Sequence, residues 1–278
     1  MRRQRPRNQK PQRHGWRDQQ RHGPARGSDT ERVLLYGLHP VEAALANPRR
    51  RIGRLVATEN AAHRLGPLMA KRGVTPELVN PKELDRLLGA DAVHQGLALE
   101  SEPLPPVGLD EVSTGGILLV LDQVTDPQNV GAALRSAAAF GASGLVLTER
   151  HSPPLSGVLA KAASGALDIV PVILVKNLAQ SLAKLGERGY LRVGLADEAS
   201  EALENAPLTR PLALVLGAEG KGLRQLTREH CDRLCRISTE SALASLNVSN
   251  AVAVALHWAS LKTKAEGGRS GLSESICI

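Results

Sequence analysis

Small hydroxyl and amide side chains that could hold a ligand stand at 245–250, directly before the apolar run 251–258. The segment reads Ser-Leu-Asn-Val-Ser-Asn. Such residues cap helix N-termini because their side chains accept hydrogen bonds from free backbone N–H groups. A helix N-terminus also attracts anions and polar ligands. Alone, the segment predicts only a cap, but polar segments at 122–135 and 217–222 also follow apolar sequence, so together the three predict one composite site.

The segment 121–137 predicts the end of a strand, a polar loop and a helix that opens near Asn129. Arg135 then stands among Ala, Leu and Ser, which offer little to cover a guanidinium. One interpretation is a side chain that pairs with an acid or extends to solvent. The other is a guanidinium aimed into a cleft, where it would hold or deprotonate a nucleic-acid group. Spacing alone favours neither.

The segment 216–223 reads Leu-Gly-Ala-Glu-Gly-Lys-Gly-Leu, and its three glycines would let a ligand approach the backbone closely. It is not a Walker A loop, because only two residues separate Gly217 from Gly220 and Gly222 replaces the magnesium-binding Ser/Thr. Glu219 would repel a phosphate and so favours a ligand with positive charge or hydroxyl donors. Taken alone, the segment is better explained as a plain strand-to-helix turn.

The elements that position these segments read as an α/β fold. Continuous apolar runs are typical of strands buried on both faces of a parallel sheet. They are expected at 117–121, 144–147, 169–173, 191–195 and 212–216. Helical patterns lie between them, at 130–140, 155–163, 178–188 and 223–230. Ligands of such sheets sit beyond the carboxyl ends of the strands.

A smaller α/β unit precedes this sheet, with strands expected at 33–36, 54–57, 76–79 and 96–100 and helices at 39–46, 61–72 and 82–88. A Pro- and Gly-rich stretch then predicts a linker. The expected organisation is a basic tail, a small domain, a linker, a main domain and a flexible C-terminus, at 1–31, 32–102, 103–115, 116–264 and 265–278.

The basic charge belongs to the N-terminal tail. Residues 1–28 hold nine Lys or Arg and one acid, a net +8, whereas the whole chain carries +7. We expect this Arg-, Gln-, Gly- and Pro-rich tail to be disordered. Arg-rich arms usually contact nucleic acid through phosphates; a purely solubilising role is the alternative.

The remaining composition excludes several protein classes. The chain has three cysteines: Cys231, Cys235 and Cys277. So small and uneven a number is not typical of a disulfide framework and favours a reducing cytoplasm. Their spacing gives no zinc motif, so no metal is expected. No apolar run approaches a membrane span and no secretory signal follows the basic start.

In order and spacing, the three polar segments resemble the SpoU (TrmH) branch of the SPOUT superfamily of RNA methyltransferases. The matching residues are 126–131 with Arg135, then 216–222, then 245–249. The unit ending at 94–98, His-Gln-Gly-Leu-Ala, resembles the family's small RNA-substrate-binding domain. The resemblance implies a parallel-sheet SPOUT domain with a C-terminal deep trefoil knot, S-adenosylmethionine as methyl donor and a homodimer. A knot is contrary to general rules of chain topology and comes from the resemblance alone.

The resemblance also implies residue roles. Arg135 would be the catalytic residue acting on a ribose 2′-hydroxyl, while Asn129, Glu219, Ser245 and Asn247 would shape the site. An arginine normally stays protonated, so stabilising the developing alkoxide is physically easier for it than acting as a base.

The cofactor would be held by the following residues: Leu216, Gly217, Ile237, Leu246 and Asn247. The family often has Pro after the isoleucine and Gly four residues after it, where this chain has Ser238 and Ser241.

The implied activity is 2′-O-methylation of a guanosine in 23S rRNA, in the peptidyl-transferase P loop, with naked rRNA or a ribosome precursor as partner. The extra N-terminal domain favours this over a tRNA guanosine methyltransferase. A non-catalytic RNA-binding protein of ribosome assembly is the alternative from another class. The full set of implied site residues is evidence against it.

Overall fold

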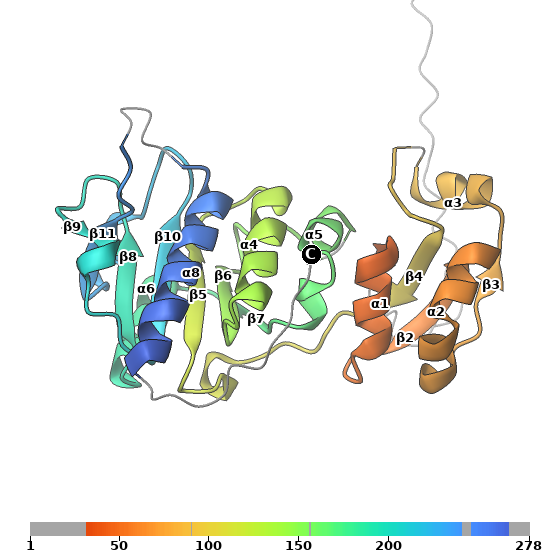
Figure 1. Ribbon diagram of the computed structural model, residues 1–278, viewed down its shortest axis with the longest axis horizontal. Coiled ribbons are helices and arrows are strands. Elements are labelled where there is room, and N and C mark those ends of the chain that lie inside the picture. Colours follow the sequence, from red (N-terminus) through yellow and green to blue (C-terminus); the bar gives the residue numbers. More distant parts are fainter. Residues whose placement is uncertain (1–31, 90, 156, 241–245, 267–278) are drawn as a thin grey trace, which may run out of the picture. The chain divides into compact units, whose positions relative to one another are not determined.

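A computed structural model of the chain describes residues 32–266, except 90, 156 and 241–245 (Figure 1). The expected tail at 1–31, Ser241, Ser245 and the last residues, 267–278, therefore lie outside the described residues. The predicted knot depends on the path through 241–245 and stays a prediction.

The described chain after Gly116 contains one seven-stranded sheet with the order β7-β6-β5-β10-β8-β11-β9. Every neighbouring pair in it is parallel, which confirms the predicted α/β class with a parallel sheet. The strands are β5 (Ile117–Asp122), β6 (Gly144–Thr148), β7 (Val172–Val175), β8 (Leu191–Leu195), β9 (Glu201–Ala202), β10 (Leu212–Gly217) and β11 (Arg233–Arg236).

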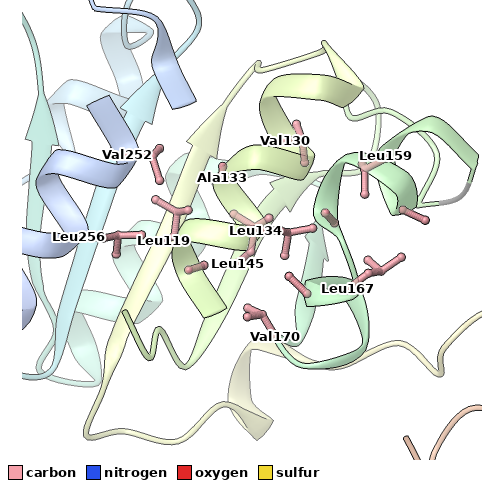
Figure 2. Packing of buried hydrophobic residues seen from close by; sticks show 14 of the residues in the cluster. Leu119, Val130, Ala133, Leu134, Leu145, Leu159, Leu167, Val170, Val252 and Leu256 are labelled. Carbon is pink, nitrogen blue, oxygen red and sulfur yellow. The ribbon is translucent and has the colours of Figure 1, made fainter. Parts of the chain in front are cut away.

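Helices cover both faces of the sheet. Successive side chains of a strand point to opposite faces, so one strand packs against helices on both sides. In β5, Leu119 packs in a core with the helices α4 (Pro127–Ala139), α5 (Gly157–Ala163) and α8 (Val248–Glu266). Figure 2 shows it between residues of α4, such as Ala133, and residues of α8, such as Val252. Its neighbour Val120 packs instead with Leu182 of α6 (Leu178–Glu187). The continuous apolar runs of the sequence follow from this double burial.

The strand expected at 169–173 begins later than predicted. Ala166–Asp168 forms a 3-10 helix, Ile169 is 68% exposed, and β7 starts only at Val172. Pro171 lacks an N–H for the ladder and contributes only its carbonyl, which accepts from the N–H of Leu145 at 2.9 Å. The charged strand β11 and the two-residue β9 have no apolar run and were not predicted.

The N-terminal part forms a four-stranded sheet with the order β1-β4-β2-β3. Its strands are β1 (Val33–Tyr36), β2 (Ile52–Ala57), β3 (Glu77–Leu78) and β4 (Leu97–Ser101). Its helices are α1 (Leu38–Ala46), α2 (Glu59–Arg72) and α3 (Pro81–Leu88). Each element predicted here is present, with boundaries shifted by one or two residues.

One buried ion pair could not be foreseen from the sequence. Arg50, which is 2% exposed, donates from Nε and Nη2 to the Asp168 carboxylate at 2.9 Å. Asn47 Nδ2 donates to the same carboxylate at 3.0 Å. Losing one partner of such a pair costs about 3–5 kcal/mol, because it leaves an uncompensated buried charge.

Candidate functional site

The polar segments meet at the carboxyl edge of the seven-stranded sheet. Strands β5 and β10 pair in parallel, with Asp122 opposite Gly217 at their last positions. The chain after Asp122 leads into α4, which carries Asn129 and Arg135, whereas the chain after Gly217 forms the glycine-rich loop. Figure 1 shows α4 and α8 on the same side of these two strands. The sheet thus brings together side chains more than 100 residues apart.

A hydrogen-bonded network connects all three segments. Asn247 Nδ2 donates to Asn129 Oδ1 at 3.1 Å and also donates to Glu219 Oε1. The backbone N–H of Val248, at the start of α8, donates to the same Glu219 oxygen at 3.2 Å. A carboxylate is favourable there because the N-terminus of a helix carries partial positive charge. Asn247 is therefore fixed between an amide of α4 and a carboxylate of the glycine-rich loop.

The cap predicted for the last helix is Asn247. Its Oδ1 accepts from the backbone N–H of Ser249 at 2.9 Å and from the Ser249 hydroxyl at 2.5 Å. This is the geometry of an N-cap side chain bonded to the second helical residue. Because Nδ2 faces Asn129 and Glu219 while Oδ1 faces the helix, both ends of the amide are occupied and its orientation is set.

Arg135 lies on α4, six residues after Asn129, with an exposed side chain. Within residues 32–266 that the structure describes, its guanidinium forms no ion pair and no hydrogen bond. The interpretation that it pairs with an acid is therefore not supported by these residues. Helical side chains tilt toward the N-terminus of their helix, so the long arginine side chain on α4 extends back toward the site's edge of the sheet. The structure does not connect it directly to the Asn247 network.

A cavity of about 300 Å³ opens beside this network. Four of the five residues expected to hold a cofactor, Leu216, Gly217, Ile237 and Leu246, line it. The fifth, Asn247, is not part of the wall but bonds to Glu219, which is. The rest of the wall is made by 195–198, 218–223, Arg228, Thr239, Val248 and Ala251.

The glycine-rich loop folds back tightly on itself. The N–H of Gly222 donates to the Ala218 carbonyl at 2.8 Å, which closes a short hairpin over Gly217. A Cβ at Gly217 would lie 2.1 Å from the carbonyl carbon and oxygen of Gly222. Only glycine fits at this position, and the backbone of the loop consequently forms part of the cavity wall.

The cavity wall carries charged groups of both signs: three acids (Asp197, Glu198 and Glu219) and two bases (Lys221 and Arg228). Glu198 pairs with Arg228, and this hydrogen bond lowers the pKa of the Glu198 carboxyl. Asp197 and Glu219 also line the cavity and are exposed. Together with the apolar side chains of Leu195, Leu216 and Ile237, these two exposed carboxylates suit a ligand with an apolar ring, hydroxyl donors and positive charge.

Several residues of this site were missed by the sequence analysis. Ala196, Asp197 and Glu198 follow β8, and their position after a buried strand is the signal that could have found them. Ser249 was quoted in the motif but given no role. Ser238, at the position where the resembling family often has Pro, donates to Glu204 Oε2 at 3.1 Å.

Comparison with known proteins now identifies the family. Residues 116–257 match the SpoU rRNA Methylase family, and residues 34–107 match the RNA 2′-O ribose methyltransferase substrate-binding family. The first match alone covers half of the chain. The chain belongs to the SpoU rRNA methylase family. This confirms the resemblance noted from the three polar segments.

Several curated SpoU relatives are similar over most of their length. The 23S rRNA (guanosine-2′-O-)-methyltransferase RlmB of Pseudomonas putida is 39% identical over 80% of this chain and 93% of its own. The RlmB of Photorhabdus laumondii is 43% identical, over 80% and 95% of the two chains.

Solved structures of SpoU methyltransferases share the fold. A TrmH-family RNA methyltransferase from Porphyromonas gingivalis has a TM-score of 0.67 at 27% identity, covering 84% of this chain and 90% of its own. The SpoU methyltransferase AviRb from Streptomyces viridochromogenes, solved in complex with AdoMet, has a TM-score of 0.71 at 23% identity, covering 86% and 92%. At that identity, AviRb supports the fold alone.

Proposed function

We propose that this SpoU protein is an S-adenosylmethionine-dependent methyltransferase that modifies the ribose 2′-hydroxyl of a guanosine in 23S rRNA. The observation that carries the proposal is the bonding of Asn129, Glu219 and Asn247 to one another beside the cavity. The RlmB proteins, similar over about four-fifths of the chain, support the substrate. The peptidyl-transferase P loop is the proposed target region.

The cavity is the proposed site of S-adenosylmethionine. The cofactor would be held by Leu216, Gly217, Ile237, Leu246 and Asn247, the first four of which line the cavity. The apolar side chains of Leu216 and Ile237 suit the adenine ring, and the carboxylates of Asp197 and Glu219 suit the ammonium and sulfonium charges. When bound, the cofactor supplies a methyl group already activated on a positively charged sulfur.

The chain's own residues then have to align and activate the ribose oxygen. Arg135 is the proposed catalytic residue, because its exposed guanidinium has no acid partner in the described part of the chain and is free for RNA. Its positively charged guanidinium would stabilise negative charge as it develops on the 2′-oxygen. Asn129, Glu219, Ser245 and Asn247 are proposed to fix the positions of substrate and cofactor, so that the reacting atoms meet in line.

The proposed domains keep the boundaries expected from the sequence: an N-terminal tail (1–31), an RNA-binding domain (32–102), a linker (103–115), a methyltransferase domain (116–264) and a C-terminal segment (265–278). The family match at 34–107 supports RNA binding by the first folded domain. The tail, with its net charge of +8 over residues 1–28, is proposed to add phosphate contacts.

We also propose a homodimer that acts in the cytoplasm. Val254 and Leu261, seven residues apart on α8, are 45% and 52% exposed. Seven residues are close to two helical turns, so both side chains lie on one face. An apolar stripe on such a helix favours a protein contact. Within the described ranges, no helix is long and apolar enough to cross a membrane.

The substrate assignment is tested by methyl transfer from labelled S-adenosylmethionine to 23S rRNA and to bulk tRNA, both lacking ribose methylation. Label in a 2′-O-methylguanosine of 23S rRNA is the expected result. Label in tRNA alone would agree with the proposed methyl transfer but contradict 23S rRNA as the substrate. If only ribosome precursors accept label, the partner is the assembling particle.

A further inference from the structure

A buried carboxylate behind the site has no role in the chemistry described above. Asp122, the last residue of β5, is fully buried. Its carboxylate accepts two hydrogen bonds from Arg224, from the backbone N–H at 3.1 Å and from Nε at 2.8 Å, and it forms an ion pair with Nη2 at 2.8 Å. Hydrogen bonds to a buried charge are among the stronger ones in proteins. Neither residue lines the cavity.

Arg224 is the residue at which the chain leaves the glycine-rich loop. The loop starts at Gly217, which lies opposite Asp122 in the ladder between β10 and β5. It ends at Leu223, whose side chain is buried, and Arg224 follows directly. Asp122 therefore lies beside the start of the loop through backbone pairing and holds its end through its carboxylate. Both ends of the main cavity wall are attached to one residue.

The same residue also begins the segment that leads to the proposed catalytic helix. Gln123 has a φ of +59°, an unfavourable conformation for a residue with a side chain, and Val124 is buried again. Asp126 then caps α4 by accepting from the N–H of Gln128 at 3.1 Å. A shift of Asp122 would consequently move both the loop and the start of α4.

We propose that Asp122 and Arg224 form a clamp that holds the glycine-rich loop in register with α4. Asp122 is a positioning residue: it acts through Arg224 and the backbone and touches neither cofactor nor RNA. The inference rests on the proposed placement of S-adenosylmethionine in the cavity. It predicts that breaking the clamp weakens cofactor binding even where the fold is retained.

The chain offers a matched control pair. Asp232 accepts from the backbone N–H of Arg192 at 2.8 Å and from its Nε at 3.0 Å, the pattern seen at Asp122. Arg192 lies near the start of β8, so this pair stands at the opposite edge of the sheet from the cavity. The Asp232 side chain is more exposed, 35% against 0% for Asp122, so Asp232→Asn is the milder change.

The test compares S-adenosylmethionine affinity by isothermal titration for the full chain and for Asp122→Asn, Arg224→Lys and Asp232→Asn. Loss of a charged hydrogen bond is worth about tenfold to a hundredfold. We expect the Kd to rise by at least tenfold in Asp122→Asn and severalfold in Arg224→Lys, with Asp232→Asn close to the unmodified chain. Arg224 is 44% exposed, so its lysine variant tests the clamp even if Asp122→Asn does not fold.

Each outcome has one meaning when the variants are compared at the same interval below their melting temperatures. Folded clamp variants with an unchanged Kd overturn the clamp. Equal weakening by Asp232→Asn overturns it too, since the effect would then follow from general destabilisation. If the unmodified chain binds no S-adenosylmethionine, or Gly217→Ala binds as well as it does, the proposed cofactor site fails instead.

Discussion

Gly217→Ala is the substitution with the clearest expected effect on the cofactor site. The added Cβ would lie 2.1 Å from the carbonyl carbon and oxygen of Gly222, where ordinary contacts begin at 3.4 Å. The overlap of about 1.3 Å involves backbone on both sides, so no flexible side chain relieves it. The loop from Ala218 to Gly222 must move outward by about this amount. Since that loop is a main part of the cavity wall, the substitution acts directly on the cofactor.

A misplacement of about 1 Å in an active site can slow the reaction on the order of a hundredfold, and we take a loss of the same order for cofactor affinity. We therefore expect the Kd of Gly217→Ala for S-adenosylmethionine to rise about a hundredfold, close to 2.7 kcal/mol. Isothermal titration measures it, and thermal unfolding shows how much of the fold is affected.

The matched control for this experiment is Gly189→Ala, outside the cavity wall. Gly189 has a φ of +81° and open space around the Cβ position, so alanine there brings backbone strain without a collision. That strain costs about 1–2 kcal/mol of stability. We expect only a small change in Kd for this variant. A Gly217→Ala protein that binds S-adenosylmethionine as tightly as the unmodified chain would refute the assignment of the cavity.

Three further outcomes are expected. Glu219→Gln removes the charge of the carboxylate that accepts hydrogen bonds from Asn247 and Val248. Since charged hydrogen bonds are about twice as strong as neutral ones, we expect at least tenfold slower methyl transfer. The control Glu229→Gln, at an exposed position, should leave the rate unchanged. Deleting residues 2–28 should weaken RNA binding and flatten its salt dependence, and an unchanged slope in filter binding would leave the tail as a solubiliser. Burial raises the pKa of the Cys231 thiol to about 12, so the folded state keeps its proton where the unfolded state loses it, and stability falls as pH rises above about 9. Cys231→Ala should reduce that fall in urea titrations at pH 8 and 10 and leave the part due to Cys235, whose pKa burial raises to about 11; an identical pH dependence with and without the Cys231 thiol would contradict the argument.

The main elements of the fold were predictable because burial on both faces leaves a simple signature. The apolar runs at 117–121 and 212–216 became the central strands β5 and β10. The prediction of strands failed where a buried strand has no apolar run, or where an apolar run does not form a strand along its whole length. Strand β11 has an arginine at each end and a single fully buried residue, Cys235, and so carries no apolar run. Pro171 lies inside an apolar run but cannot donate to a ladder, which displaced the predicted strand.

The candidate site was predictable as a set of segments but not as a geometry. The Asn247 cap follows from local helix chemistry, which sequence records. Its bonds to Asn129 and Glu219 join residues 118 and 28 positions away, and only the strand order brings them together. The clamp between Asp122 and Arg224 spans 102 positions and left no local pattern at all. The tight packing at Gly217 likewise depends on the folded loop.

Methyl transfer and cofactor binding by Arg135→Ala test whether Arg135 acts on the RNA while the loop at Gly217 holds the cofactor. Both are measured on the same preparation, with unmethylated 23S rRNA as substrate. We expect loss of methyl transfer with a Kd for S-adenosylmethionine within a fewfold of that of the unmodified chain. Full activity of the variant would contradict the role of Arg135, and an equal loss of cofactor binding would contradict the separation of the two functions.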